Sequence, residues 1–392
     1  MKKVLIIGAG FLQDFVICKA NSMGYETYAV DADPDAVGFK HAHHHSVIDI
    51  VDEKACLKYA MENCVDGVLT AATDYGVLTA AYVSQKMSLP GLKYKVAQLI
   101  KNKYEVRRCL CEHHVDDTEQ TYEINRNTDV GYLTQILSYP VMVKPCDGSG
   151  SRGASRVDEK NKLAQACELA MASSITDRAV IEPFIEEYGA ESLVVNGKIH
   201  VLGIMQKWMT DPPYYAELGH SIPNNLKPAV EKKVKKYVAS AIKTLGINFG
   251  SVNMDILITA DEKVYIVDIG ARMGGNMIGP CVIPYGTGID YMAAMLQNAV
   301  GDDVDLGIKE HTAVVTRLLA FKNGVIRNLP DVKQIERHFG VEIYHHMELG
   351  MRINEYHTNL DGCGYIVSRA KTQEKAIEKA ENALNYFRNT IF

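Results

Sequence analysis

The sequence predicts an α/β fold for the first part of the chain and an α+β fold for the rest. Residues 1–92 alternate short apolar runs with helical segments, which favours parallel strands joined by helices. Farther on, Asn196-Gly197 between two apolar runs is a strong hairpin signal and indicates antiparallel strands. We therefore expect a doubly wound parallel domain (1–92), a central domain of antiparallel sheets and helices (93–307) and a small C-terminal α+β domain (308–392).

The individual elements follow from hydrophobic periodicity and from glycine or proline at their ends. The predicted strands are 4–7, 26–30, 47–50, 67–70, 140–144, 179–181, 191–195, 198–204, 250–258 and 263–269. The predicted helices are 13–23, 53–63, 76–86, 93–110, 160–172, 227–245 and 373–390.

Composition excludes several classes of protein. Of the 392 residues, 47% are hydrophobic and 23% charged, which is ordinary for a globular chain with a large core. The net charge of −6 argues against a protein that binds nucleic acid by neutralising phosphates. No apolar run reaches the roughly 18–20 residues that span a bilayer, and no export signal is expected. The nine cysteines form no C-x-x-C pair, so we expect reduced thiols in a cytoplasmic protein.

A glycine turn ends the first predicted strand. Gly8-Ala9-Gly10 is typical of a Rossmann-like domain, but a dinucleotide fingerprint would have a third glycine where Gln13 stands. Asp31 lies about twenty residues farther on, where such folds often bind a ribose. An NAD-linked oxidoreductase that uses the Gly8/Gly10 turn therefore remains an alternative.

A second glycine-rich segment follows a strand that ends on a lysine. Lys144 closes the run 141–144, and Asp147-Gly-Ser-Gly-Ser-Arg-Gly153 comes directly after it. Backbone N–H groups of such a loop can bind phosphate oxygens, and a nearby lysine can bridge two phosphates. The pattern is not that of a P-loop, and a flexible surface turn is the alternative.

Two acidic residues interrupt neighbouring apolar strands. Asp255 and Asp268 would lie side by side if the short turn near Asp261 joins the two strands as a hairpin. Two buried, unpaired carboxylates are costly, and a hard divalent cation offsets that cost. The sequence therefore predicts a Mg²⁺ site, with solvated strand acids as the alternative.

Together with Asn102-Lys103, Ile181-Glu-Pro-Phe-Ile185, Glu191 and Asp268-Ile-Gly-Ala-Arg272, these features resemble the ATP-grasp superfamily, in particular its carboxylate–amine ligases. The resemblance covers nearly the whole chain, in a layout similar to biotin carboxylase and carbamoyl-phosphate synthetase-like enzymes. It implies a central ATP-grasp domain with a lid subdomain at about 125–185. It also implies ATP and Mg²⁺ as cofactors, with Mn²⁺ as an alternative ion.

The resemblance carries specific roles to residues of this chain. Lys103 and Lys144 would hold the ATP phosphates, residues 148–153 would close over them, and Glu182 would meet the adenine amino group. The ATP-binding residues implied are Lys103, Lys144, Gly148, Ser149, Gly150, Ser151, Gly153, Glu182, Phe184 and Ile185 (both through the backbone), and Glu191 on the ribose. Lys144 and Arg272 are the expected catalytic residues, with Arg272 facing the transferred phosphate or the substrate carboxylate.

The metal site departs from the superfamily pattern. Glutamates are usual where Asp255 and Asp268 stand, and Gly270 replaces an asparagine two residues after the second acid. We expect Asn276 to supply the missing amide oxygen. On the substrate side, Lys207, Glu217, His220 and Arg272 are the candidates. The alternative for the segment around Glu217 is a loop that folds over itself.

The function implied is that of an ATP-dependent ligase. It would activate a small-molecule or amino-acid carboxylate as an acyl phosphate and join it to an amine, with release of ADP and phosphate. A biotin-carboxylase-like or carbamoyl-phosphate-type enzyme acting on bicarbonate is an alternative, as is a non-catalytic nucleotide-binding regulator.

The partners expected are small-molecule carboxylates and amines, with no nucleic acid and no membrane, and a homodimer remains open. His41, His43, His44 and His45 are interpreted as a solvated loop.

Overall fold

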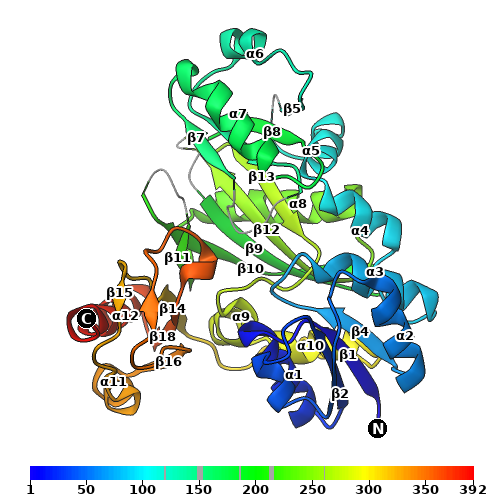
Figure 1. The fold of residues 1–392 in the computed structure, drawn as a ribbon, viewed down its shortest axis with the longest axis vertical. Helices are drawn as coiled ribbons and strands as arrows, with labels where there is room; N and C mark the ends of the chain where they lie inside the picture. The colour runs from blue at the N-terminus through cyan, green and yellow to red at the C-terminus, as the bar shows by residue number, and fades with distance from the viewer. Residues whose placement is uncertain (119–120, 148–152, 185–186, 212–215, 260) are drawn as a thin grey trace.

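The computed structural model describes the whole chain except residues 119–120, 148–152, 185–186, 212–215 and 260. Three lobes surround a large central sheet: the N-terminal lobe, a small-sheet lobe at the opposite end, and the C-terminal lobe (Figure 1). Within the described residues, no helix is long and apolar enough to cross a membrane.

The N-terminal lobe is a parallel sheet in the order β3-β2-β1-β4, covered by helices on both faces. Its elements are β1 (Lys3–Ile7), α1 (Phe11–Ser22), β2 (Glu26–Asp31), β3 (His44–Val47), α2 (Glu53–Asn63), β4 (Gly67–Thr70) and α3 (Gly76–Lys86). Val4 and Ile6 of β1 face a core shared with α1, whereas Leu5 and Ile7 face a core shared with α2 and α3. The doubly wound prediction is confirmed. Strand β3 begins three residues before the predicted start, because this edge strand consists largely of exposed histidines and gives no apolar signal.

The prediction of a single helix over 93–110 is wrong. The chain forms α4 (Tyr94–Lys101) and α5 (Lys103–Glu112), with the break at Asn102. The Asn102 side chain accepts hydrogen bonds from the backbone N–H groups of Tyr104 and Glu105 and so caps α5. This cap places Lys103 in the first turn of a new helix.

The small-sheet lobe has strand order β5-β8-β6-β7. Its elements are β5 (Tyr122–Ile124), α6 (Val130–Ile136), β6 (Val141–Pro145), β7 (Ser155–Val157), α7 (Leu163–Ala172) and β8 (Ala179–Pro183). The apolar residues Val143, Ile181 and Leu163 are fully buried between sheet and α7. This lobe contains most of the segment that we propose as a lid.

The central sheet is antiparallel throughout, in the order β13-β12-β9-β10-β11-β14-β18-β16. Its strands are β9 (Glu187–Val195), β10 (Lys198–Met209), β11 (Glu217–Ile222), β12 (Gly250–Ile258), β13 (Val264–Gly270), β14 (Ala313–Leu318), β16 (Val341–His345) and β18 (Gly364–Ala370). The remaining elements are α8 (Pro228–Thr244), α9 (Ile283–Thr287), α10 (Tyr291–Ala299), β15 (Gly324–Val325), α11 (Val332–Phe339), β17 (Arg352–Ile353) and α12 (Gln373–Thr390). The hairpin prediction at Asn196-Gly197 is confirmed, and both residues have positive φ. The sheet runs across residue 307, so the division of the chain at 92 and 307 stays a proposal.

Candidate active site

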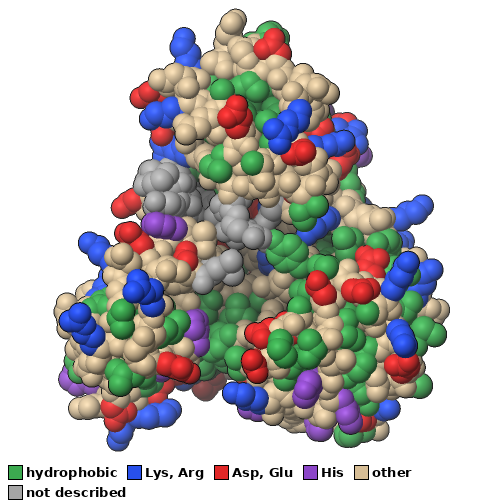
Figure 2. Space-filling model, viewed as in Figure 1, with side chains coloured by type: hydrophobic (Ala, Val, Ile, Leu, Met, Phe, Trp, Pro, Cys, Tyr) green, Lys and Arg blue, Asp and Glu red, His purple; other side chains and the backbone are tan. Residues whose placement is uncertain are grey.

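A cavity of about 610 Å³ lies where the three lobes meet. The space-filling view shows the surface hollowed between these lobes (Figure 2). The cavity is lined by residues from all of them. The predicted site residues among its lining are Lys103, Lys144, Glu182, Phe184, Lys207, Glu217, His220, Asp255, Asp268, Arg272 and Asn276. Gly153 and Glu191 are not among the lining residues, and Gly148, Ser149, Gly150, Ser151 and Ile185 lie outside the described residues.

One end of the cavity is formed by the small sheet. Lys144 on β6 and Glu182 on the neighbouring strand β8 form an ion pair with 2.6 Å between Nζ and Oε1. Lys144 Nζ also donates to the carbonyl oxygen of Val267 at 2.8 Å, and both charged side chains are largely buried. Beside them, the Arg156 guanidinium lies 4.5 Å from the centre of the Phe184 ring. A fixed cation, a carboxylate and an aromatic ring at one cavity end suit a ligand that carries phosphate and a flat, amine-bearing ring.

Lys103 joins this end to the acidic strands. Its ammonium forms an ion pair with Asp268. Burial by itself would raise the pKa of Asp268, but the charges of Lys103 and Lys144 outweigh it and lower the pKa to about 2. Asp268 is therefore ionised at neutral pH and available as a ligand for a cation.

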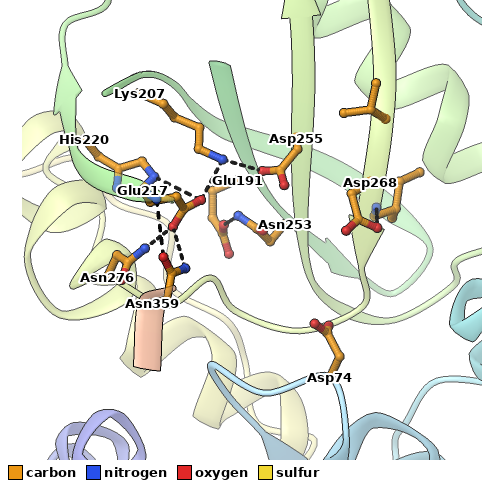
Figure 3. A network of polar contacts seen from close by, with 12 residues as sticks. Asp74, Glu191, Lys207, Glu217, His220, Asn253, Asp255, Asp268, Asn276 and Asn359 are labelled. Carbon is orange, nitrogen blue, oxygen red and sulfur yellow. Dashed lines mark hydrogen bonds and ion pairs between the residues drawn. The ribbon is translucent and has the colours of Figure 1, made fainter. Parts of the chain in front are cut away.

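Asp255 and Asp268 are opposite each other in the register of β12 and β13, as the sequence predicts. Both carboxylates are partly exposed to the cavity (Figure 3). Paired carboxylate oxygens beside a phosphate-binding lysine are the ligand type that Mg²⁺ prefers, so the residues present fit that ion.

The expected metal role of Asn276 does not fit the geometry. Its Nδ2 contacts Glu217, and its Oδ1 accepts a hydrogen bond from the Tyr365 hydroxyl at 3.1 Å. Figure 3 shows Asn276 beside Glu217 and away from Asp268. Asn276 has a left-handed φ of 50°, a backbone conformation that the sequence pattern did not reveal.

Gly270 is explained by the Arg272 side chain. A Cβ at Gly270 would lie 2.8 Å from Asp74 Oδ1 and 3.0 Å from Arg272 Cζ. The Arg272 guanidinium pairs with Asp74 at 3.0 Å and donates to Asn253 Oδ1 at 3.2 Å. The space that an asparagine would fill is therefore occupied by this arginine and its partners.

Asp74 and Asn253 are cavity residues that the sequence reasoning missed. Asp74 follows β4, at the carboxyl end of a parallel strand, where open α/β sheets place ligand-binding residues. Asn253 lies two residues before Asp255 on β12, so strand alternation puts both side chains on one face. Burial lowers the pKa of Arg272, but Asp74 reverses this effect and raises it, which keeps the guanidinium charged.

The opposite cavity end is built around Lys207. Its buried ammonium lies 2.6 Å from Glu217 and 2.8 Å from Asp255 (Figure 3). Burial would raise the pKa of Glu217, yet the charges of Lys207 and His220 hold it well below its usual range. Burial lowers the pKa of His220 to about 4, so the imidazole is neutral at pH 7. The predicted substrate residues are thus brought together, but as one interlinked charge network.

Glu191 does not face the cavity, so the expected ribose contact does not fit. Its carboxylate is fully buried and accepts hydrogen bonds from the Tyr291 hydroxyl at 2.5 Å, Asn253 Nδ2 at 2.9 Å and the Gly274 N–H at 3.1 Å. Burial raises its pKa to about 7, and these hydrogen bonds only partly offset that effect. Glu191 supports Asn253 and the backbone of the segment after β13.

The glycine turn of the N-terminal lobe is covered by a side chain. The Gln13 side chain fills it: a Cβ at Gly8 would lie 3.3 Å from Gln13 Cγ. Asp31 Oδ2 accepts the Ala9 N–H at 2.8 Å and so closes the turn from the other side. The geometry does not support the oxidoreductase alternative.

Comparison with known proteins agrees with this layout. Residues 137–280 match the ATP-grasp domain family, and residues 317–390 match the L-amino acid ligase C-terminal domain 2. A formate-dependent phosphoribosylglycinamide formyltransferase of Variovorax paradoxus is 24% identical over 76% of this chain and 73% of its own length.

Two solved structures have the same fold over almost the whole chain. The L-amino acid ligase from Bacillus licheniformis superposes with a TM-score of 0.85 at 22% identity, covering 98% of this chain and 97% of that one. The biotin carboxylase domain of 2-oxoglutarate carboxylase from Hydrogenobacter thermophilus, solved with MgADP and bicarbonate, has a TM-score of 0.79 at 18% identity, covering 98% and 89%.

Proposed function

Because residues 137–280 match the ATP-grasp domain family, we propose that this chain is an ATP- and Mg²⁺-dependent ligase of the ATP-grasp superfamily that phosphorylates a carboxylate and joins the acyl phosphate to an amine. The observation that carries the proposal is one cavity lined by the Lys144–Glu182 pair of the small sheet, the Lys207–Glu217 pair of the central sheet, and Arg272. The NAD alternative fails for the reasons given above.

Each group of cavity residues has its own role in the proposed reaction. Lys144 and Glu182 would bind the nucleotide, and Lys103 would bind the phosphates near Asp268. Mg²⁺ held by Asp255 and Asp268 would add positive charge at the phosphoryl group. Arg272 would stabilise the charge that develops during transfer to the carboxylate oxygen, since a preorganised cation needs no reorganisation at that moment. No protein nucleophile is required, because the carboxylate itself attacks the γ-phosphorus.

The acid and the amine that we propose are small molecules of the amino-acid class. The match of residues 317–390 to the L-amino acid ligase C-terminal domain supports this class over bicarbonate. The cavity end at Glu217 and Asn359 offers carboxylate and amide oxygens to an ammonium group. We also propose a cytoplasmic location, where ATP is available and the nine free cysteines stay reduced.

The test supplies the protein with ATP, Mg²⁺ and pairs of amino acids, and measures ADP, phosphate and the mass of the product. A parallel reaction contains bicarbonate in place of the amino acids. We expect phosphate release that requires both an acid and an amine, with a product heavier than either. Release with bicarbonate alone would favour the carboxylase alternative, and no release with any pair would contradict the ligase.

A further inference from the structure

A second cluster of metal-ligand side chains lies on the N-terminal lobe, outside the residues that line the cavity. Asp14 and Cys18 are four residues apart on α1 and therefore share one helix face. His41 follows the 3₁₀ helix Val37–Lys40, which packs against α1. The ligand atoms of all three side chains lie within 4.8 Å of one another.

The backbone around His41 is held in place by α1. Asn21 Nδ2 donates to the His41 carbonyl oxygen at 2.7 Å, and the Gly38 N–H donates to the Ala9 carbonyl oxygen at 2.7 Å. The imidazole is therefore presented to Asp14 by a fixed segment. The sequence interpretation of His41 as a solvated residue missed this carboxylate, because Asp14 is 27 positions away in the chain.

From this geometry we propose that Asp14, Cys18 and His41 bind a divalent cation of the zinc class. His41 Nδ1 lies 2.7 Å from Asp14 Oδ1, and Cys18 Sγ lies 3.8 Å from the same oxygen. Tetrahedral zinc with bonds of about 2.0–2.3 Å separates its ligand atoms by about 3.3–3.7 Å. For a cation to bind, the imidazole must turn away from Asp14 by a fraction of an ångström, and all three ligand atoms, which lie within 4.8 Å of one another, must take up this spacing.

The chemical type of the ligand atoms determines which metal ion each of the two sites prefers. Thiolate and imidazole favour Zn²⁺, whereas the carboxylate pair in the cavity offers only oxygen and favours Mg²⁺. The two sites therefore do not compete for one ion. Cys18 is exposed and the His41 side chain is 51% exposed, so a water molecule can complete the shell.

Binding deprotonates the thiol and releases its proton to solvent. The bound ion links α1 to the segment after Val37–Lys40. It therefore stabilises the lobe whose residues Phe11 and Leu12 line the cavity.

Cobalt(II), added to chelator-treated full-length protein, is the probe. We expect one equivalent to give a near-ultraviolet thiolate-to-cobalt charge-transfer band and the visible bands of tetrahedral cobalt, both bleached by Zn²⁺. Cys18→Ser should abolish the charge-transfer band, and His41→Ala should weaken Zn²⁺ binding at least tenfold in competition with a chromophoric chelator.

Two matched controls accompany these variants. Cys64 is an exposed cysteine on the same lobe. His44 pairs with Glu26 at 2.9 Å and has the same exposure as His41, but this pair is not part of the Asp14–Cys18–His41 cluster. Cys64→Ser and His44→Ala should leave the spectrum and the affinity unchanged. The proposal is overturned if wild-type protein shows no charge-transfer band, or if the band survives Cys18→Ser. ATP turnover plays no part in this test, so its outcome is independent of the ligase proposal.

Discussion

Asp255 and Asp268 face each other across two strands, yet their lysine partners differ in origin and setting. Asp268 pairs with Lys103, which lies in the first turn of helix α5 and therefore outside the sheet. Asp255 pairs with Lys207, which belongs to the same sheet and is also bound to Glu217. In our proposal Lys103 exchanges its carboxylate partner for a phosphate, whereas Lys207 stays between two acids. Of the two lysines, Lys103 is therefore the one that we propose for a charged ligand, and Lys207 the one that supports the structure.

The largest expected effect is a loss of turnover when Asp268 is substituted. Asp268→Asn removes a charge that would hold the cation at the phosphates, so turnover should fall by about 10²–10³-fold. Asp255→Asn should be milder, because Lys207 keeps Glu217 and the charge network persists. Steady-state kinetics over a Mg²⁺ titration measures both, with thermal unfolding as the check on folding. Equal losses in the two variants would remove the distinction drawn between the acids.

The next effect concerns stability rather than turnover. Lys207→Met leaves Glu217 and Asp255 without their shared cation in a largely buried place, which should lower the free energy of unfolding by about 3 kcal/mol. Lys233→Met is the matched control, since Lys233 pairs with Asp117 at 2.7 Å nearer the surface and should contribute under about 1 kcal/mol. Urea unfolding compares the two. A loss no greater than the control's would mean that Lys207 is not a structural cation.

The contacts of these two acids also show which parts of the site could be predicted from the sequence. The opposition of Asp255 and Asp268 follows from strand alternation and a short turn, both local signals, and it is confirmed. The link between Lys207 and Asp255 spans a third strand, β9, and the one between Asp74 and Arg272 joins residues 198 positions apart. Such pairs depend on the tertiary arrangement of lobes, which no local pattern encodes.

Two predicted site residues make contacts that differ from the expected ones, and the reason is equally physical. Glu191 lies on β9, beyond Glu182 in the chain, where the resemblance implied a ribose-binding acid, but its buried side chain contacts Tyr291 and does not line the cavity. Asn276 sits close enough in sequence to replace the missing amide, yet its left-handed backbone turns it to Glu217. Residue type and spacing identified residues that line the cavity, and backbone geometry decided which face each side chain took.

A smaller effect tests the nucleotide end. Glu182→Gln removes the carboxylate that holds Lys144, so we expect the KM for ATP to rise about tenfold, equivalent to about 1.4 kcal/mol, with a smaller change in kcat. Glu123→Gln is the control, because Glu123 pairs with Arg178 on the same small sheet but away from the cavity. An unchanged KM for ATP would place the nucleotide elsewhere.

The smallest effect examines how Lys207 reaches Asp255 across β9. Gly189 stands opposite Asp255 in the register, and the lysine stem passes over it. A Cβ there would lie 3.2 Å from Met205 Cε, which is a tight contact, and 3.5 Å from Lys207 Cδ, so Gly189→Ala should displace Met205 and with it the lysine stem that lies alongside. We expect a loss of about 1 kcal/mol in unfolding free energy from overpacking and a severalfold higher Mg²⁺ requirement, since the Asp255 carboxylate loses its fixed partner. The carbon atoms nearest to a Cβ at Gly203 on β10 belong to Ile222, Ile283 and Thr287, so Gly203→Ala should destabilise the protein without changing the Mg²⁺ requirement. If both alanine variants shift that requirement equally, the effect belongs to the sheet as a whole and not to the path of Lys207.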